Sequence, residues 1–246
     1  MTKKWLSLIL LLAITCVYIY TNPYTEEEDE TLSLKLNDGV EELDFLAELE
    51  KEVIIELNRA RTDPAGYAEF VEDFKKHYVG KYIYLPGRNP IITREGAPAV
   101  NEAIEYLKSA QPVPPLRVSK GLSYAARDHV EDQGPTGLTG HYGSDKSSPK
   151  ERIDRFGKCG AAYGENINYG NRSARQIVMQ LIIDDGIMDR GHRKNIFKAQ
   201  FRVVGVSYGP HHSYGRMCVM DFAGSYSETP RRGGPIRLNY CRFITR

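Results

Sequence analysis

Apolar residues recur at helical spacing through much of the first 185 positions of the chain. In the first such segment, residues 45–62, they lie three or four positions apart and predict an amphipathic helix: Leu46, Leu49, Val53, Leu57 and Ala60. The same spacing predicts further helices over 67–78, 97–110, 120–133 and 173–185, with a short one near 149–156. After residue 200 the pattern changes, because valine and other strand-forming residues dominate 201–208 and 217–223. Helices early and strands late predict an α+β fold.

Capping and turn residues set the boundaries of these elements. Asp63-Pro64 ends the first helix, since proline disfavours helical geometry in the residue before it. Ser119 and Ser173 are predicted to cap the helices that follow them. Residues 79–92 and most of 134–170 are rich in glycine, proline and polar side chains, so they are predicted to be loops.

The N-terminal segment has the pattern of an export signal. Lys3 and Lys4 precede an apolar stretch from Leu6 to Ile19, which is shorter than the roughly 20 residues that cross a bilayer comfortably. No good small-residue cleavage site follows. Residues 1–22 are therefore expected to be a cleaved signal peptide, which makes the protein secreted, or an uncleaved signal anchor, which holds it on the membrane.

Charge divides the rest of the chain. Residues 24–52 hold twelve acidic side chains and two lysines, and 23–46 is expected to be an acidic linker. From 53 onward there are 29 basic and 20 acidic residues, and 225–246 is expected to be a basic tail after a domain over 47–224. A hydrophobic content of 41% is enough for a buried core. No basic run is interleaved with aromatic residues, so nucleic-acid binding is not expected.

Two histidines and two acids occur in glycine-rich or helical segments and are candidates for a functional site. His141 follows Gly140, Glu165 follows Gly164, and His192 follows Gly191, while Asp184 is expected inside the helix between them. Asp185 is the rival of Asp184 for the inward position, because both occur at helical steps from apolar residues. Neutral imidazoles bind Zn²⁺, and carboxylates complete or orient such sites. The alternative is a metal-free cluster of histidine–carboxylate hydrogen bonds.

Several tracts in a fixed order resemble a known family. They are Glu56-Leu57-Asn58-Arg59-Ala60-Arg61, Ala125-Ala126-Arg127-Asp128-His129, Gly140-His141, Gly164-Glu165-Asn166-Ile167, Gly191-His192-Arg193-Lys194-Asn195-Ile196 and Met217-Cys218-Val219-Met220-Asp221-Phe222-Ala223-Gly224. From about Ala47 to Gly224 the chain resembles the CAP superfamily: cysteine-rich secretory proteins, antigen-five proteins and pathogenesis-related class one proteins. The style of the tracts is nearest to the bacterial and protist branch. The resemblance implies a three-layer αβα sandwich around a small antiparallel sheet, with a central cleft.

In the family that cleft holds two histidines and two acids. His141, His192 and Glu165 match three of them. The fourth is normally a glutamate three residues after a tryptophan, and here Asp184 and Leu181 occupy those places. The side chain is one methylene shorter and a large aromatic wall is missing.

Two kinds of function remain open. The favoured one is an exported binding module without turnover, whose ligand is a sterol-like or other apolar molecule, a glycan or a cell-surface protein. The alternative is a hydrolase that uses Zn²⁺ or another divalent metal at His141 and His192, with Glu165 orienting or activating water. Ser144 and Ser148 lie near His141, but neither stands in a nucleophile elbow. A third possibility is a structural cell-surface domain on an uncleaved anchor.

The remaining cysteines and histidines receive structural predictions. After the leader, Cys159, Cys218 and Cys241 remain, and either Cys159 pairs with Cys218 or all three are thiols. Among the histidines, His129 is predicted to be packed in the core, and His211 and His212 to be exposed in a hairpin loop. Asn171-Arg172-Ser173 is a glycosylation sequon, used only on a eukaryotic secretory route.

Overall fold

The computed structural model describes residues 43–87 and 89–229. The helices in these ranges are η1 (Leu43–Phe45), α2 (Glu48–Thr62), α3 (Pro64–Lys75), α4 (Ala97–Ser109), α5 (Lys120–Thr136), α6 (Pro149–Asp154), α7 (Ala174–Ile183) and α8 (Gly191–Ile196). The strands are β1 (Tyr78–Val79), β2 (Tyr82–Ile83), β3 (Ile91–Ile92), β4 (Arg117–Val118), β5 (Gly157–Tyr169), β6 (Val203–His211) and β7 (Gly215–Glu228). The predicted leader, almost all of the acidic linker, and Cys241 lie outside the described residues. Within them, no helix combines the length and apolar character needed to span a membrane.

A four-stranded sheet in the order β4-β6-β7-β5 forms the centre of the molecule. The β6–β7 hairpin and the β5–β7 pair are antiparallel, as expected for the small sheet. The short strand β4 runs parallel to β6, so the sheet is mixed at that edge. Strands β4 and β6 are joined not by a hairpin but by a long connection through α5, α6, β5, α7 and α8, which allows the chain to return in the same direction.

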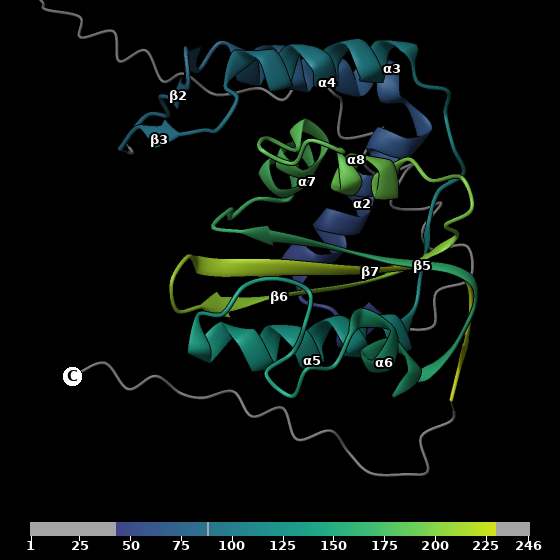
Figure 1. The fold of residues 1–246 in the computed structure, drawn as a ribbon. Coiled ribbons are helices and arrows are strands. Elements are labelled where there is room, and N and C mark those ends of the chain that lie inside the picture. Colours follow the sequence, from purple (N-terminus) through teal and green to yellow (C-terminus); the bar gives the residue numbers. More distant parts are fainter. Residues whose placement is uncertain (1–42, 88, 230–246) are drawn as a thin grey trace, which may run out of the picture.

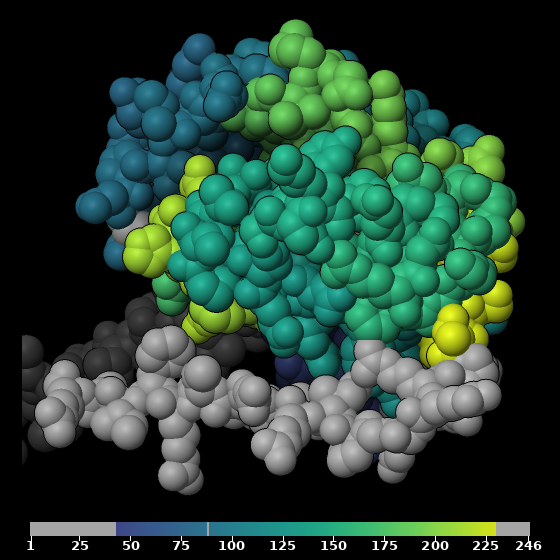
Figure 2. Space-filling model, turned by 60° about the horizontal axis from the view of Figure 1, so that its bottom comes forward, coloured from purple at the N-terminus to yellow at the C-terminus, as the bar shows by residue number. Residues whose placement is uncertain are grey.

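Helices cover both faces of this sheet, which confirms the predicted α+β sandwich (Figure 1). On one face lie α5 and α6, and the apolar side chains of α5 pack on the strands through Leu122, Ala125, Ala126 and Val130. On the other face lie α2, α7 and α8, with α3 and α4 stacked outside them (Figure 1). The largest hydrophobic cluster fills this side and joins α2, α3, α4 and α7 to the sheet. Figure 2 brings the bottom of Figure 1 forward and shows α5 and the residues that follow it covering this face of the molecule.

Helix caps follow the predicted residues. Ser119 accepts a hydrogen bond from the Leu122 N–H, and Ser173 accepts one from the Gln176 N–H. Asp63 ends α2 and also caps α3, accepting from the Gly66 N–H. These short polar side chains satisfy N–H groups that have no partner within the first helical turn.

Three segments differ from the sequence-based predictions. The predicted loop 157–169 is the long strand β5, whose glycines and asparagines carry little strand preference but pair along β7 over almost its whole length. The predicted loop 79–92 contains the small sheet β1–β2–β3. The segment that begins at Gly191 is the short helix α8 rather than a loop. In addition to these three segments, strand β7 continues to Glu228, into the region predicted to be the tail.

The predicted Cys159–Cys218 disulfide is wrong, and both residues are free thiols. Cys159 lies opposite Tyr226 in the β5–β7 ladder, whereas Cys218 lies opposite Asn168. Nine positions of β5 separate the two places, roughly 25–30 Å at the usual rise of a strand. A disulfide needs Cα atoms within about 7 Å, so the register of this strand pair excludes the bond.

Candidate functional site

His141 and Glu165 form the first histidine–carboxylate pair. His141 lies in the loop after α5, where Gly137 and Gly140 have the positive φ angles of 73° and 102° that turn the chain back over the sheet. Glu165 projects from β5. The His141 Nδ1 lies 2.7 Å from the Glu165 Oε1, and because a carboxylate only accepts, Nδ1 carries the hydrogen. The carboxylate is 1% exposed and the imidazole 46%, so the pair connects the interior to the surface.

Arg152 from α6 holds this pair in place. Its Nη2 donates to the Glu165 Oε2 at 2.6 Å and to the His141 carbonyl oxygen at 3.1 Å, and its Nη1 donates to the Ser147 carbonyl at 2.9 Å. The guanidinium is as buried as the carboxylate. A buried ion pair is stable only where further hydrogen bonds offset the loss of hydration, and the two carbonyls supply them.

Asp221 on β7 is a second buried acid beside Glu165, directly opposite it in the strand pair. No donor among the described residues reaches either Asp221 oxygen. Burial, and then the charge of Glu165, raise the pKa of Asp221 well above its ordinary value. This shift favours the protonated carboxyl, which can donate to Glu165 on the neighbouring strand. His129, fully buried on α5 as predicted, donates from Nε2 to the Gly140 carbonyl oxygen at 2.9 Å, and burial lowers its pKa, which favours the neutral ring.

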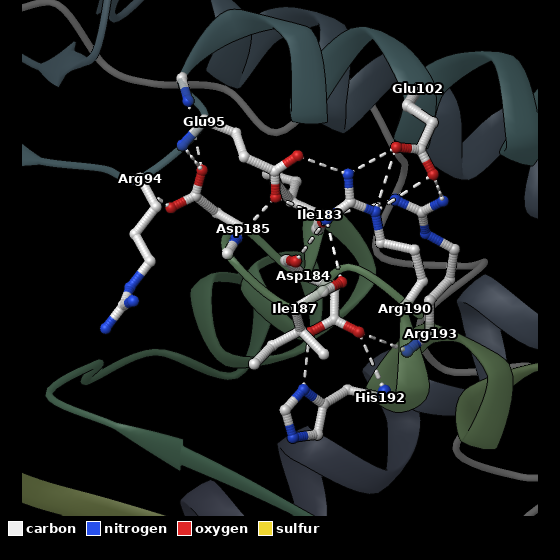
Figure 3. Close-up of polar contacts among 12 residues, drawn as sticks. Arg94, Glu95, Glu102, Ile183, Asp184, Asp185, Ile187, Arg190, His192 and Arg193 are labelled. Atoms are coloured by element: carbon white, nitrogen blue, oxygen red, sulfur yellow. Dashed lines mark hydrogen bonds and ion pairs between the residues drawn. The ribbon is translucent and has the colours of Figure 1, made fainter.

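Asp184 and His192 form the second pair (Figure 3). The helix predicted to contain Asp184 ends at Ile183, and Asp184 caps it in the left-handed conformation with φ 57°. This turn aims the carboxylate at α8: Oδ1 lies 2.6 Å from the His192 Nδ1, and Oδ2 accepts from the His192 N–H at 2.9 Å. A carboxylate at a helix N-terminus also meets the positive end of the helix dipole. Asp185 points elsewhere and accepts from the backbone of residues 94–96.

A network of arginines and glutamates fixes the loop between α7 and α8 (Figure 3). Arg190, itself left-handed with φ 54°, donates to both oxygens of Glu95 and to Glu102 on α4, at 2.6 to 3.1 Å. It also donates to the Asp184 carbonyl oxygen at 3.0 Å. Arg193 donates to Glu102 at 2.9 Å and to carbonyls at the end of α7. The position of Asp184, and with it of His192, thus depends on a helix more than 80 residues earlier.

Two asparagines link the pairs. The Asn166 Nδ2 donates to the His192 carbonyl at 3.0 Å, and the Asn195 Nδ2 donates to the Asn166 Oδ1 at 2.9 Å and the Glu165 carbonyl at 3.4 Å. Asn166 follows Glu165 on β5. The structure therefore arranges the four predicted residues as two pairs, one between the loop after α5 and β5 and one between the end of α7 and α8, joined through Asn166 and Asn195.

The donor chemistry of the two imidazoles fits a divalent metal. Each ring gives its Nδ1–H to a carboxylate, and no hydrogen bond within the described ranges engages either Nε2. Metal-binding histidines commonly have this arrangement, in which the second nitrogen is oriented by a carboxylate. Within residues 43–87 and 89–229, however, no three His, Cys, Asp or Glu side chains gather into a set able to hold an ion. A metal at His141 and His192 would therefore need water or ligand atoms to complete its coordination.

The two serines near His141 in the sequence form other contacts. The Ser144 Oγ donates to Asp132, and Ser148 caps α6 and contacts Glu151. Cys159 is half-buried, and burial raises the pKa of its thiol. The Asn171 side chain of the sequon donates to Asn168 at 3.0 Å in the turn after β5.

One histidine was placed wrongly by the sequence. His211 is 2% exposed: its Nε2 lies 2.8 Å from the Leu138 carbonyl, and its ring packs against Tyr169 and Tyr214. The β6–β7 hairpin folds back over the end of α5, so this residue of the predicted loop is covered. His212 is exposed, as predicted.

Arg152, Asp221, Glu95, Glu102 and Arg190 were missed as participants in the site. Asp221 carried the clearest signal, because it is a single acid within the otherwise apolar run of β7. A charged residue at such a position is buried only if it is paired or neutral.

Comparison with known proteins finds a family whose model matches most of the chain. The model of the cysteine-rich secretory protein family, CAP, matches residues 57–222. The uncharacterized protein YkwD of Bacillus subtilis is 29% identical over 101 residues, a match that covers 41% of this chain and 37% of YkwD. The chain therefore spans well under half of that relative's length.

Among solved structures, the chain is similar to an extracellular protein with an SCP domain from Bacillus anthracis, at 18% identity and a TM-score of 0.37. That alignment covers 52% of this chain and 37% of the other. An outer surface protein of Borrelia burgdorferi aligns at 14% identity with a TM-score of 0.38, covering 45% of this chain and 78% of that one. The family model matches most of the described residues, and on that match the protein belongs to the CAP family.

Proposed function

We propose that the protein is an exported CAP-domain binding module that performs no turnover, in which the surface around His141 and His192 contacts the ligand. The observation that carries the proposal is the full engagement of both acids. One Glu165 oxygen accepts a hydrogen bond from His141 and the other accepts from Arg152. One Asp184 oxygen accepts from the His192 ring and the other accepts from backbone N–H groups. Each acid therefore orients an imidazole, and the Nε2 atom, which forms no hydrogen bond among the described residues, is available to a ligand.

Export is supported by the N-terminal pattern of two lysines and an apolar stretch, and by membership of a secretory family. N-terminal sequencing of the exported protein separates a cleaved signal from an anchor. Recovery of Met1 supports the anchor.

The side chains next to the two pairs favour a ligand with apolar surface over a glycan. Leu138 and Tyr142 flank His141 in its loop and are exposed, and Ile187 and Met188 are exposed in the loop before His192. Exposed clusters of large apolar side chains commonly mark binding sites. A lipid or an apolar patch of a cell-surface protein fits both the imidazoles and these side chains.

Native mass spectrometry of the purified protein, with and without added lipid extract, tests this proposal. A ligand adduct is expected, and the double variant Tyr142→Ser/Met188→Ser should lose it. The control Tyr163→Ser changes a 45% exposed aromatic residue on β5, outside these loops and the β1–β3 sheet, and should retain it. Turnover of a peptide or ester substrate, or labelling of Ser144 or Ser148 by a fluorophosphonate, would contradict the absence of catalysis.

Divalent metal binding at His141 and His192 is a second candidate, supported by the orientation of both rings through Nδ1. The residues would hold the ion through their Nε2 atoms, and the metal would supply Lewis-acid chemistry or a bridge to an anionic ligand group. Zn²⁺ at a hundredfold excess over its dissociation constant should raise the free energy of unfolding by about 2.7 kcal/mol. Protons compete for the same nitrogens, so the increase should vanish in acid. An increase that persists in His141→Ala/His192→Ala would sink this candidate.

A further inference from the structure

The small sheet β1–β2–β3 is an apolar surface that the CAP site does not use. It lies at the outer end of the α3–α4 layer, beyond the first turn of α4 (Figure 1). The register places Val79 opposite Tyr82, and Tyr82 opposite Ile92, so these three side chains form one row across all three strands. Tyr84 belongs to the same face by strand alternation, and its ring centroid lies 6.4 Å from that of Tyr82.

The two faces of this sheet differ in what covers them. On the inner face Ile83 is buried in the core and the Tyr78 ring packs edge-on against Phe74, while Ile91 at the edge is 44% exposed. On the outer face all four side chains are exposed: Val79 65%, Tyr82 45%, Tyr84 50% and Ile92 69%. An antiparallel sheet with one face in water normally carries polar residues on that face. Here the outer face is apolar throughout.

Most of the charge around this face is basic, although Lys76 pairs with Asp73 at 2.7 Å. Residues 75–94 contain five lysines and arginines and no aspartate or glutamate. Lys75, Lys76, Lys81 and Arg94 are exposed where the segment leaves α3, turns between strands and returns to α4. In Figure 3 the Arg94 side chain extends away from the buried network.

The sheet is held firmly to the body of the protein. The Thr93 N–H donates to the Lys81 carbonyl at 2.8 Å, and Asp185 accepts from the backbone N–H groups of residues 94–96. Gly96 lies so close to the Gly80 carbonyl that a Cβ there would approach to 2.5 Å. The apolar row is therefore presented in a fixed orientation and needs no ordering on binding.

We propose that the outer face of β1–β3 docks on a lipid bilayer that contains anionic lipids. Tyrosine and aliphatic side chains suit the boundary between headgroups and acyl chains, and surrounding lysines and arginines meet the negative surface. The excess of basic side chains makes this surface complementary to an anionic one. A stable protein interface uses about 20–30 residues a side. Four outer-face side chains are far fewer, whereas shallow insertion beside several bases suffices for a peripheral contact.

Site-specific fluorescence of the full chain tests the proposal. Trp5 is the single tryptophan, so Trp5→Phe/Tyr82→Trp carries its one indole on the proposed face. With vesicles of phosphatidylcholine and phosphatidylglycerol, its emission should move to shorter wavelength and be quenched by brominated acyl chains. Trp5→Phe/Tyr163→Trp is the matched control, because Tyr163 on β5 is also 45% exposed, and it should show neither effect.

The charge contribution is measured on the same reporter. Lys81→Gln and Arg94→Gln should each weaken binding to anionic vesicles roughly five-fold, the effect of one basic residue near such a surface. Circular dichroism checks that each variant is folded. An unchanged indole spectrum with vesicles overturns the proposal and leaves the face to a protein partner. A concentration-dependent shift without vesicles assigns it to a second copy of the chain and also overturns it. Loss of the ligand adduct at the histidine site would leave this result untouched.

Discussion

At the scale of single residues, the least expected feature is a buried cluster of one cation and two acids. Arg152 neutralises Glu165, and Asp221 lies beside them with its proton retained. One positive and one negative charge remain, so this cluster holds no net charge. Buried charges are tolerated when they are paired in this way. The pattern of glycine and histidine identified His141 and Glu165 from the sequence. Arg152 and Asp221 could not be identified in that way, because only the β5–β7 register and the position of α6 bring them to Glu165.

Asp221→Asn should stabilise the protein at neutral pH. The native pKa of Asp221 is raised, so above about pH 4 the native state binds a proton that the unfolded chain has released. Native stability therefore falls as pH rises from the unfolded pKa toward the native one. Asparagine has no such proton to lose and still donates a hydrogen bond to Glu165. The gain is about 1.4 kcal/mol for each pH unit by which the native pKa exceeds the unfolded one.

Urea unfolding from pH 4 to 8 measures this difference, and Asp145→Asn is its control. Hydrogen bonds from Ser147, together with Arg155, lower the pKa of Asp145 to about 2, so its removal should act in the opposite direction, with stability lost above pH 4. Parallel pH profiles for wild type and Asp221→Asn would show that Asp221 is ionised in the native state.

At the scale of elements, the end of α7 and the start of α8 are shaped by distant side chains. The apolar pattern predicted a helix through residue 185, but Asp184 adopts a left-handed turn that lets it cap α8. Such a turn is unfavourable for a residue other than glycine and persists where other contacts support it. Arg190 supplies that support by binding Glu95, which precedes α4, and Glu102 on α4. Local periodicity carries no information about these contacts.

Glu95→Gln should weaken this loop and flatten the response to acid. Hydrogen bonds from Arg190 and from the Gly186 N–H lower the pKa of Glu95 to about 2. The stabilisation is present above the ordinary pKa near 4.5 and is lost as pH falls toward 2. After allowance for solvent screening, the loss at neutral pH should be roughly 1–2 kcal/mol. Thermal unfolding between pH 2 and 7 measures it, with exposed Glu105→Gln on α4 as control. Equal effects of the two variants would refute the role of the network.

At the scale of the whole molecule, the fold keeps the two cysteines of the described residues, Cys159 and Cys218, apart as free thiols. Cys218 lies at the centre of β7, fully buried, and burial raises the pKa of its thiol far above the ordinary value. The fold must therefore be stable through its hydrophobic core, without a bond between Cys159 and Cys218.

Alkylation tests this arrangement. Iodoacetamide at pH 8 should leave Cys218 unmodified in the folded protein and modify it after denaturation, because the reactive thiolate is neither formed nor accessible. Peptide mapping without reduction should find no Cys159–Cys218 linkage. Recovery of the linked peptide pair would mean that the β5–β7 register is wrong.

The sequence alone determined the positions of most helices and the β6–β7 hairpin. It also determined the family tracts and the four residues of the two histidine–carboxylate pairs. These depend on periodicity, capping and local motifs, which are properties of neighbouring residues. Tertiary structure alone decided the strand β5, the burial of His211, the free thiols, the proton on Asp221 and the outward apolar face of β1–β3. Each of these depends on strand register or on a partner distant in the chain, and contacts of that kind arise only when the layers pack.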